Sequence, residues 1–266
     1  MLRMIQIDKS FNIGTINEKQ IFQGLNLTIN DGDFLTVIGG NGAGKSTMLN
    51  LIAGVHKADG GRIILDGEDL TYKNETQRAR YIGRVFQDPM MGTAPTMMIE
   101  ENLAMAYRRT KRRTLAWGIS QKERELYRDS LSQLGLGLED RMKTKVGLLS
   151  GGQRQALTLL MATLKKPKLL LLDEHTAALD PATAEKVLRL TREIVEGERI
   201  TCLMITHNMK NALELGSRTF MMDAGRVVLD IGGEERKGLT VDDLLERFRA
   251  GAGKNLDNDR ILLSND

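Results

Sequence analysis

The sequence predicts an α/β protein that combines a mainly parallel sheet, an antiparallel β layer and an inserted helical subdomain. Apolar runs at residues 169–172 and 200–206 show no regular alternation of polar and apolar residues, which is typical of parallel strands buried on both faces. Strand patterns at residues 2–9, 20–30 and 61–66 are bounded by turn signals and predict the antiparallel layer.

Length and composition set limits on the protein class. The chain has 266 residues, enough for one large α/β domain or a core with an inserted subdomain. Its net charge of +3 is too small to indicate nucleic acid as the main partner. The single cysteine, Cys202, has apolar neighbours and is expected in the core of a protein from a reducing compartment. No signal peptide is recognised and no apolar run approaches the roughly eighteen residues of a membrane span, so we expect a soluble, cytoplasmic chain.

A glycine-rich loop lies between a strand pattern at residues 34–38 and a helical pattern at 48–53. It has the form G-x-x-x-x-G-K-[ST], and this strand, loop and helix setting predicts a P-loop NTPase core. Glycines let backbone N–H groups point at a phosphate, and the following helix start favours an anion. Lys45 is the expected charge for the β- and γ-phosphates, Ser46 the expected Mg²⁺ ligand, and Thr47 is expected to cap the helix or line the site. The loop comprises Gly39, Gly40, Asn41, Gly42, Ala43, Gly44, Lys45, Ser46 and Thr47. A flexible turn with a solvated lysine is the alternative, and the flanking elements disfavour it.

The next segments predict a strand and then a helical insert. Residues 81–86 form an apolar strand pattern that leaves Gln87 at its carboxyl end before a proline. Helical periods follow at residues 99–108 and 121–134, after a methionine-rich stretch. The basic cluster at residues 108–113 is more typical of a solvated helix end than of a nucleic-acid or lipid-headgroup patch.

A second helix start also has the features of an anion site. Ser150 is a natural N-cap, and Gly151 and Gly152 leave the start of the helix bare of side chains before Gln153. On the pattern alone, this interpretation and that of a merely flexible cap are equally supported.

Two carboxylates end the buried strand at residues 169–172. Asp173 suits Mg²⁺ coordination, and Glu174 is placed to take a proton from an attacking water. The carboxyl end of a strand is where open α/β sheets bind ligands, so we favour these roles over a simple polar strand end. His207 follows the next buried strand and is predicted to donate to a phosphate oxygen. His175 adjoins the proposed base and stays ambiguous.

The carboxyl-terminal part predicts a helix at residues 182–196, a hairpin of strands at 218–223 and 226–231, and a last helix at 240–249. The pattern alone treats Phe11, which precedes a polar loop, as a packing residue.

The chain up to about residue 249 resembles the nucleotide-binding subunit of an ATP-binding cassette (ABC) transporter, because six motifs occur in that family's order. The motifs are the phosphate loop, Gln87, residues 149–153, Asp173 with Glu174, Asp180, and His207. The resemblance implies an ATPase domain at residues 1–249, with a catalytic core at 1–87 and 165–249 and a helical subdomain at 88–164. The polar and small residues from Ala250 onward predict a flexible tail at 250–266.

The same resemblance implies ATP and Mg²⁺ as cofactors. Phe11 would stack on adenine, Gln87 would contact Mg²⁺ or the attacking water, and Asp180 would line a dimer seam. Two copies would sandwich two ATP molecules, each held by one copy's phosphate loop and the other copy's Ser150 segment. Many family members have proline where His175 stands and serine where Ala177 stands, so contacts beyond the base are expected to differ here.

The resemblance further implies a function. Residues 173–181 are similar to those of tryptophan/tyrosine-type small-solute uptake systems. We expect an ATPase subunit that drives a separate membrane permease for the import of a small solute. The expected partners are a second copy, that permease and an extracytoplasmic solute-binding protein. It would lie peripherally on the inner face of the membrane. An exporter subunit, a soluble ATPase that scaffolds iron–sulfur cluster assembly, and a nucleic-acid-associated member of the family are the alternatives.

Overall fold

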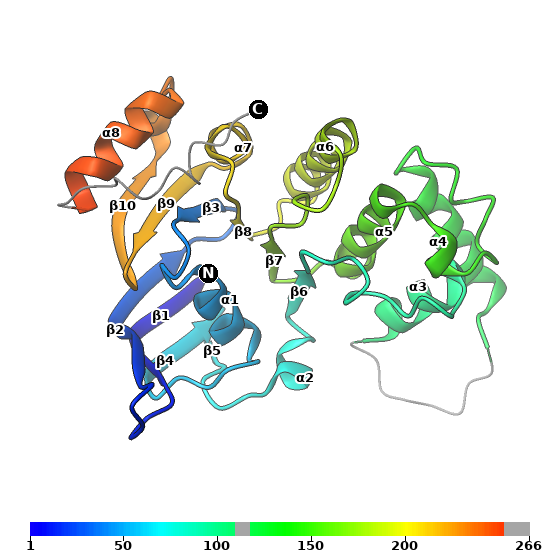
Figure 1. The fold of residues 1–266 in the computed structure, drawn as a ribbon. Helices are drawn as coiled ribbons and strands as arrows, with labels where there is room; N and C mark the ends of the chain where they lie inside the picture. The colour runs from blue at the N-terminus through cyan, green and yellow to red at the C-terminus, as the bar shows by residue number, and fades with distance from the viewer. Residues whose placement is uncertain (110–117, 253–266) are drawn as a thin grey trace. The chain divides into compact units, whose positions relative to one another are not determined.

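The computed structural model describes residues 1–109 and 118–252 (Figure 1). The chain forms two compact units, one made of Met1–Arg78 with Ile200–Asp266 and the other of Ala79–Arg199. The predicted α/β class with parallel and antiparallel strands is confirmed. The functional division predicted at residues 88–164 stays a prediction. Of the predicted tail, residues 253–266 lie outside the described part of the chain, as do residues 110–117 of the basic segment.

The first unit contains an antiparallel sheet built from early segments of the chain. Its strand order is β2-β1-β4-β5, and the first two strands pair from Leu2 opposite Ile29 to Phe11 opposite Lys19. The strands are β1 (Leu2–Phe11), β2 (Lys19–Ile29), β4 (Gly60–Leu65) and β5 (Glu68–Asp69).

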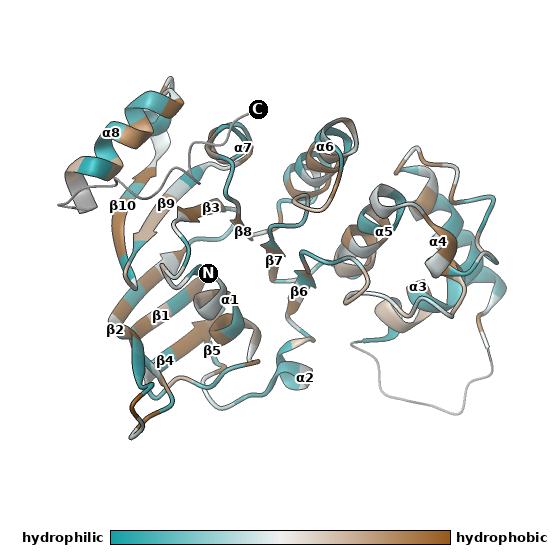
Figure 2. Ribbon diagram, in the orientation of Figure 1, coloured by the Kyte–Doolittle hydropathy of each residue, from teal (hydrophilic) through white to brown (hydrophobic). Residues whose placement is uncertain are grey.

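A second group of strands in this unit surrounds β3 (Phe34–Gly39), which is buried along its whole length. Strand β3 pairs in parallel with β8 (Cys202–Ile205) and β9 (Arg218–Asp223), and β10 (Arg226–Gly232) pairs antiparallel with β9. Figure 2 shows β3 in the brown of apolar residues, as expected for a strand buried on both faces. The lone Cys202 is fully buried on β8, which confirms its predicted core position.

Helices cover these strands. An apolar cluster joins Ile38, Met221, Ile231 and Phe248, so residues of β3, β9, β10 and the last helix share one core. Helix α7 was missed in the sequence because it is a short seven-residue segment that carries no strong periodic pattern. The helices of the unit are α1 (Lys45–Ala53), α2 (Glu75–Arg78), α7 (Met209–Leu215), the 3-10 helix η2 (Gly233–Arg236) and α8 (Val241–Ala252).

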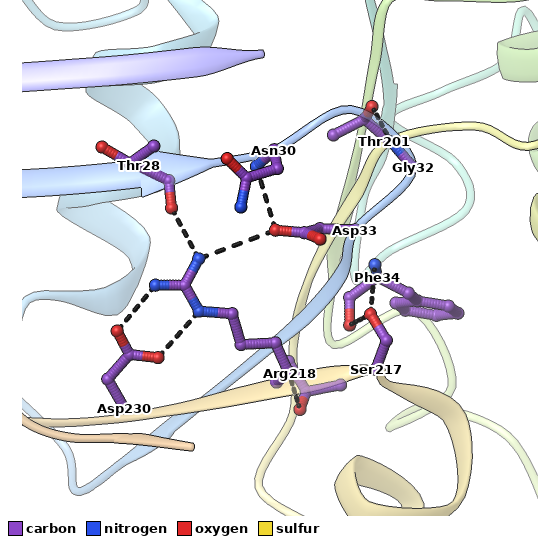
Figure 3. A network of polar contacts seen from close by, with 10 residues as sticks. Thr28, Asn30, Gly32, Asp33, Phe34, Thr201, Ser217, Arg218 and Asp230 are labelled. Carbon is purple, nitrogen blue, oxygen red and sulfur yellow. Dashed lines mark hydrogen bonds and ion pairs between the residues drawn. The ribbon is translucent and has the colours of Figure 1, made fainter. Parts of the chain in front are cut away.

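A polar network fixes the start of β3 (Figure 3). The Arg218 guanidinium donates to both carboxylate oxygens of Asp230 at 2.7 and 2.6 Å and to the Thr28 carbonyl at 2.9 Å, and it lies 3.6 Å from Asp33. Asp33 in turn accepts from the Asn30 backbone N–H at 2.9 Å. This arginine therefore ties the end of β2, the turn before β3 and the β9-β10 hairpin together.

The second unit pairs β6 (Ile82–Val85) in parallel with β7 (Leu169–Asp173) and contains a helical part with its own core. Tyr127, Leu131 and Leu103 are fully buried in that core together with Leu157. The predicted helices at 99–108 and 121–134 are present, the second ending at Ser132. The helices are α3 (Ile99–Arg108), α4 (Gln121–Ser132), the 3-10 helix η1 (Val146–Leu148), α5 (Gly151–Thr163) and α6 (Pro181–Gly197). Within the described ranges, no helix is both long enough and apolar enough to cross a bilayer.

Candidate nucleotide site

The glycine-rich loop connects β3 to α1 in the first unit. Gly42 and Gly44 have left-handed backbone angles, φ 82° and 102°, which glycine adopts without steric cost. A β-carbon at Gly39 would lie 2.3 Å from the Met222 carbonyl oxygen, and one at Gly44 would lie 2.8 Å from the Phe22 ring. Close packing therefore requires glycine at positions 39 and 44, whereas a β-carbon at Gly42 would meet no atom within 4 Å.

The start of α1 is suited to an anion. Gly44 is the N-cap, no side chain caps the helix, and the first turn has no acidic residue. The backbone N–H groups there and the positive end of the helix dipole are thus not neutralised by a side chain. This absence of a side-chain cap shows that the expectation of Thr47 as a cap was wrong. Asn41, Gly42 and Ser46 are exposed, Thr47 is half-buried, and Ala43 is buried.

Lys45 lies within the loop that it is predicted to serve. Its side chain is buried, and its Nζ donates to the carbonyl oxygens of Gly39 at 2.6 Å and Gly40 at 3.0 Å. These bonds hold the ammonium group at the loop. A cation held in this way can turn toward a phosphate group.

Arg78 supports the opposite end of α1, a role that no sequence pattern indicates. Its guanidinium donates to the carbonyl oxygens of Leu51 at 2.6 Å and Ile52 at 2.9 Å, and to those of Thr71 and Lys73. Burial lowers the pKa of Arg78 to about 10, still high enough to keep the group charged near neutral pH. A positive charge near a helix C-terminus interacts favourably with the negative end of the helix dipole. Arg78 therefore stabilises α1, the helix that follows the phosphate loop.

His207 shares an edge with the phosphate loop. Strands β3 and β8 run in parallel with Val37 opposite Ile205, and the loop and His207 each follow the carboxyl end of their strand. His207 is half-buried. The parallel register therefore brings the two predicted phosphate contacts of this unit to the same side of the sheet.

Phe11 is half-buried at the end of β1 and is held by two neighbours that the sequence did not connect to it. His56 packs edge-on against the Phe11 ring with the centroids 5.2 Å apart. Lys9 Nζ lies 5.2 Å from the ring centroid and 2.8 Å from Asp59. The lysine and the histidine therefore fix the position of the ring.

The second unit carries the predicted acid and glutamine positions. Strands β6 and β7 are parallel with Val85 opposite Leu172, so Gln87 and Asp173 follow the same edge. Asp173 lies 3.5 Å from Arg84 Nη2. Arg84 was missed because it stands inside a strand pattern, and only the strand pairing reveals that it faces the carboxylate.

The chain turns sharply after Asp173. Glu174 has a left-handed backbone with φ 44°, a conformation that costs a non-glycine residue about 1–3 kcal/mol. The Ala177 backbone N–H donates to the Glu174 carbonyl at 2.9 Å, closing a turn. His175 is buried inside this turn, and its Nε2 lies 3.0 Å from Thr191 Oγ1 on α6. Burial lowers the pKa of His175 to about 4, so the imidazole is neutral near pH 7.

The second predicted anion site begins α5. Ser150 Oγ accepts from the Gln153 backbone N–H at 3.2 Å, and the Gln153 side chain accepts from the Ser150 N–H at 3.2 Å. This capping box confirms the predicted N-cap. Ser150 and Gly151 are exposed, whereas Gly152 is buried, and a β-carbon there would lie 2.1 Å from Thr183 Cγ2. Gly152 therefore allows close packing against Thr183, whereas Gly151 leaves the exposed start of the helix without a side chain.

Asp180 caps α6 beside this helix start. Its carboxylate accepts from the Thr183 backbone N–H at 3.0 Å, and hydrogen bonding to Thr183 lowers its pKa. Because Thr183 also meets Gly152, the structure brings Asp180 and the Ser150 segment together within one unit.

The donors for a metal ion are few. Among the described residues, no group of three or more histidine, cysteine or acidic side chains could hold one. The Ser46 hydroxyl of the first unit and the Asp173 carboxylate of the second unit are each hard oxygen donors, the type of ligand that Mg²⁺ prefers.

The basic cluster has a different role where the structure describes it. Arg108 donates to Glu123 at 2.9 Å and to the Gly118 carbonyl at 2.7 Å, and Arg109 donates to the carbonyl oxygens of Ala162 at 2.9 Å and Lys165 at 2.7 Å. These two arginines join helices rather than forming a solvated helix end. Lys111, Arg112, Arg113 and Trp117 lie outside the described residues.

Comparison with known proteins identifies relatives of the chain. The family model described as "ABC transporter" matches residues 22–177. The tyrosine transport ATP-binding protein of Clostridioides difficile (strain R20291) is 45% identical over 248 residues, which cover 93% of this chain and 98% of that protein. The methionine import ATP-binding protein MetN of Rhizobium johnstonii is 36% identical over 208 residues, 77% of this chain and 55% of MetN.

Solved structures agree with this match. The dimeric ATP-binding cassette MJ0796, in a post-hydrolysis state bound to ADP and Pi, superposes with a TM-score of 0.75 at 27% identity, covering 90% of this chain and 100% of that one. The ADP conformation of the cassette MJ1267 gives a TM-score of 0.74 at 28% identity, covering 94% and 98%.

Proposed function

Because the chain belongs to the ABC transporter ATPase family, we propose that it is the ATP-hydrolysing subunit of an importer for an amino-acid-like small solute, acting with a separate membrane permease. The match to a tyrosine transport ATP-binding protein along 93% of this chain and 98% of that protein carries this proposal. MetN, named for import, supports the direction of transport, although the chain spans only 55% of its length. An exporter subunit remains the second candidate.

The predicted residues divide the work of ATP hydrolysis. The uncapped start of α1 and Lys45 hold the phosphates, and Phe11 stacks on the adenine. Glu174 takes a proton from the attacking water, while Gln87 and His207 orient the water and the terminal phosphate. Ser46, Asp173 and Gln87 would hold Mg²⁺, which would neutralise phosphate charge.

We further propose that two copies form the working unit. Ser150 and Gly151 are exposed at the start of α5, and Leu148 beside them is 73% exposed. The Ser150 hydroxyl accepts in the capping box and keeps its own hydrogen for donation. The phosphate of an ATP bound by the partner copy would accept hydrogen bonds from the Ser150 hydroxyl and the Gly151 N–H. Gln153 and Asp180 would lie at the seam between the copies. The dimeric structure of the MJ0796 cassette supports a unit of two copies.

Exposed methionines favour a surface for the permease. Met90 and Met91 follow Gln87 and are 40% and 69% exposed, and Met98 and Met105 on or beside α3 are 36% and 47% exposed. Methionine is flexible and suits an adaptable apolar interface. Docking there would place the chain peripherally on the cytoplasmic face of the membrane, with a solute-binding protein serving the opposite face.

The catalytic assignment is tested with Glu174→Gln. This variant should keep ATP affinity, lose about 100-fold or more in turnover because the base is missing, and accumulate an ATP-bound dimer on gel filtration. The matched control is Glu196→Gln, which removes the same charge from an exposed position on α6. Unchanged turnover in Glu174→Gln would remove Glu174 from this role.

Two further measurements test assembly and transport. Ser150→Arg should preserve ATP binding by a single copy and block the ATP-dependent dimer. Co-purification with a polytopic membrane protein, followed by ATP-driven uptake in vesicles reconstituted with it, tests the importer. Efflux from those vesicles would instead establish the exporter.

A further inference from the structure

The backbone conformation at Glu174 needs support from its surroundings. A left-handed φ of 44° is unfavourable for a residue with a β-carbon. The turn bond from the Ala177 N–H to the Glu174 carbonyl, 2.9 Å long, is local and surface-near, because Ala177 and Ala178 are exposed. Such a bond by itself competes with water, so a buried anchor is expected if the turn is to stay in one conformation.

His175 provides a buried anchor. It occupies the second position of this four-residue turn, its side chain is 2% exposed, and its Nε2 lies 3.0 Å from Thr191 Oγ1. Thr191 is fully buried and stands in the middle of α6, a 17-residue helix whose N-terminus is capped by Asp180. The turn is thus attached to the longest helix among the described residues of its unit.

The direction of this hydrogen bond follows from the second contact of Thr191. Its hydroxyl donates to the Val187 carbonyl at 2.8 Å, and a hydroxyl has only one hydrogen to donate. Thr191 Oγ1 therefore accepts from His175, and the imidazole carries its hydrogen on Nε2. Both partners are buried, so removing the Thr191 hydroxyl leaves the imidazole N–H unsatisfied rather than solvated, whereas Thr191 keeps its bond to Val187 if the imidazole is removed.

We propose that His175 and Thr191 are positioning residues that hold the Glu174 carboxylate in the orientation required for ATP hydrolysis. This inference rests on the proposed function of Glu174 as the base. The pair acts on the reaction only through Glu174, since neither side chain is exposed to a substrate. Proline at this turn position would restrict the backbone through its ring. Here the hydrogen bond from the buried imidazole restricts the turn instead.

The test compares Thr191→Val with Thr191→Ser in the full-length chain. Valine has the shape of threonine but leaves the imidazole N–H without an acceptor, so kcat should fall about tenfold while the KM for ATP stays within about twofold, because a small misplacement of a catalytic group costs rate rather than binding. Serine keeps the acceptor and should restore kcat to within about twofold. The matched control is Thr163→Val on α5, whose hydroxyl makes the same kind of bond to the Leu159 carbonyl without contacting a histidine.

A second background separates positioning from general damage. In a chain that already carries Glu174→Gln, Thr191→Val should change the residual hydrolysis rate by less than about twofold, because there is no base left to position. A further tenfold loss in that background would overturn the proposal, as would an unchanged kcat in a folded Thr191→Val chain. If Glu174→Gln alone retains full turnover, the assignment of the base fails instead, so the two failures are distinguishable.

A pair of histidine variants covers the case in which Thr191→Val does not fold. His175→Gln and His175→Met have similar lengths, but only glutamine carries an N–H donor near the position of Nε2. The glutamine variant should retain kcat to within about threefold and the methionine variant should lose about tenfold. Equal rates in these two variants would refute the anchoring role.

Discussion

The two glycines at the start of α5 should respond in opposite ways to alanine. A β-carbon at Gly152 would lie 2.1 Å from Thr183 Cγ2, closer than real contacts allow, whereas one at Gly151 meets only Leu179 Cδ2 at 3.3 Å. Overpacking of this kind costs about 1–3 kcal/mol. The better helix propensity of alanine offsets up to about 1 kcal/mol, so Gly152→Ala should destabilise the protein by about 1–2 kcal/mol.

The measurement is thermal unfolding of the purified chain without nucleotide. For a protein of this size a loss of 1–2 kcal/mol corresponds to a Tm lower by about 2–6 °C. Gly151→Ala, the matched control, should leave Tm unchanged or slightly higher, yet it should weaken ATP-dependent dimerisation if that residue faces the partner copy's nucleotide.

A compensating change identifies the cause. Thr183→Ser removes only the methyl group that the new β-carbon would meet and keeps the backbone N–H that Asp180 accepts. The double variant Gly152→Ala with Thr183→Ser should recover most of the lost Tm relative to Thr183→Ser alone. The steric explanation is refuted if Gly152→Ala does not lower Tm, or if Thr183→Ser gives no recovery.

Three other predictions follow from contacts described above. Lys9→Met should weaken ATP binding several-fold, because it releases the Phe11 ring from its contact with the lysine. Binding of inorganic tripolyphosphate, which has no base, should be unchanged. Equal losses of affinity for both ligands, measured by calorimetry, would contradict a base-stacking role. Arg78→Met removes the donor to four backbone carbonyls and should lower Tm by about 6 °C or more, while Arg80→Met at an exposed position should not; equal Tm values would refute the support of α1. The pKa of His175 lies at about 4 in the folded chain, below the ordinary 6.5 of the unfolded chain, so unfolded molecules bind the additional proton between these values and stability should fall by up to about 3 kcal/mol as pH drops from 6.5 to 4. Denaturant titrations across this range should show a smaller decline in His175→Gln, and identical pH profiles would contradict the shift.

Much of the fold and of the site is encoded locally and was therefore predictable. The phosphate loop, the Asp173 strand end and the Ser150 cap are each defined by neighbouring residues in a fixed order, and their physical roles as turn, strand end and helix cap depend on short-range geometry. The boundaries of β9, α3 and β7 agree with the sequence patterns for the same reason.

Other features depend on contacts between distant segments, which periodicity does not reveal. His175 was ambiguous because its partner, Thr191, is 16 residues away on a helix. Gly152 could not be distinguished from Gly151 until Thr183 was placed beside it. His56 likewise gave no sign of packing against a ring at the end of β1. Tertiary packing determines each of these roles.

The sealed position of Cys202 also makes the chain convenient for labelling. It is the only cysteine of the sequence, it is fully buried, and burial raises the pKa of its thiol well above the ordinary value. Since the thiolate is the reactive form, maleimide dyes and nitroxide reagents should not react with Cys202 in the folded chain. A cysteine introduced at the exposed Glu196 on α6 would accept a single probe per copy, and the separation of two probes could then be followed during turnover without replacing any native sulfur.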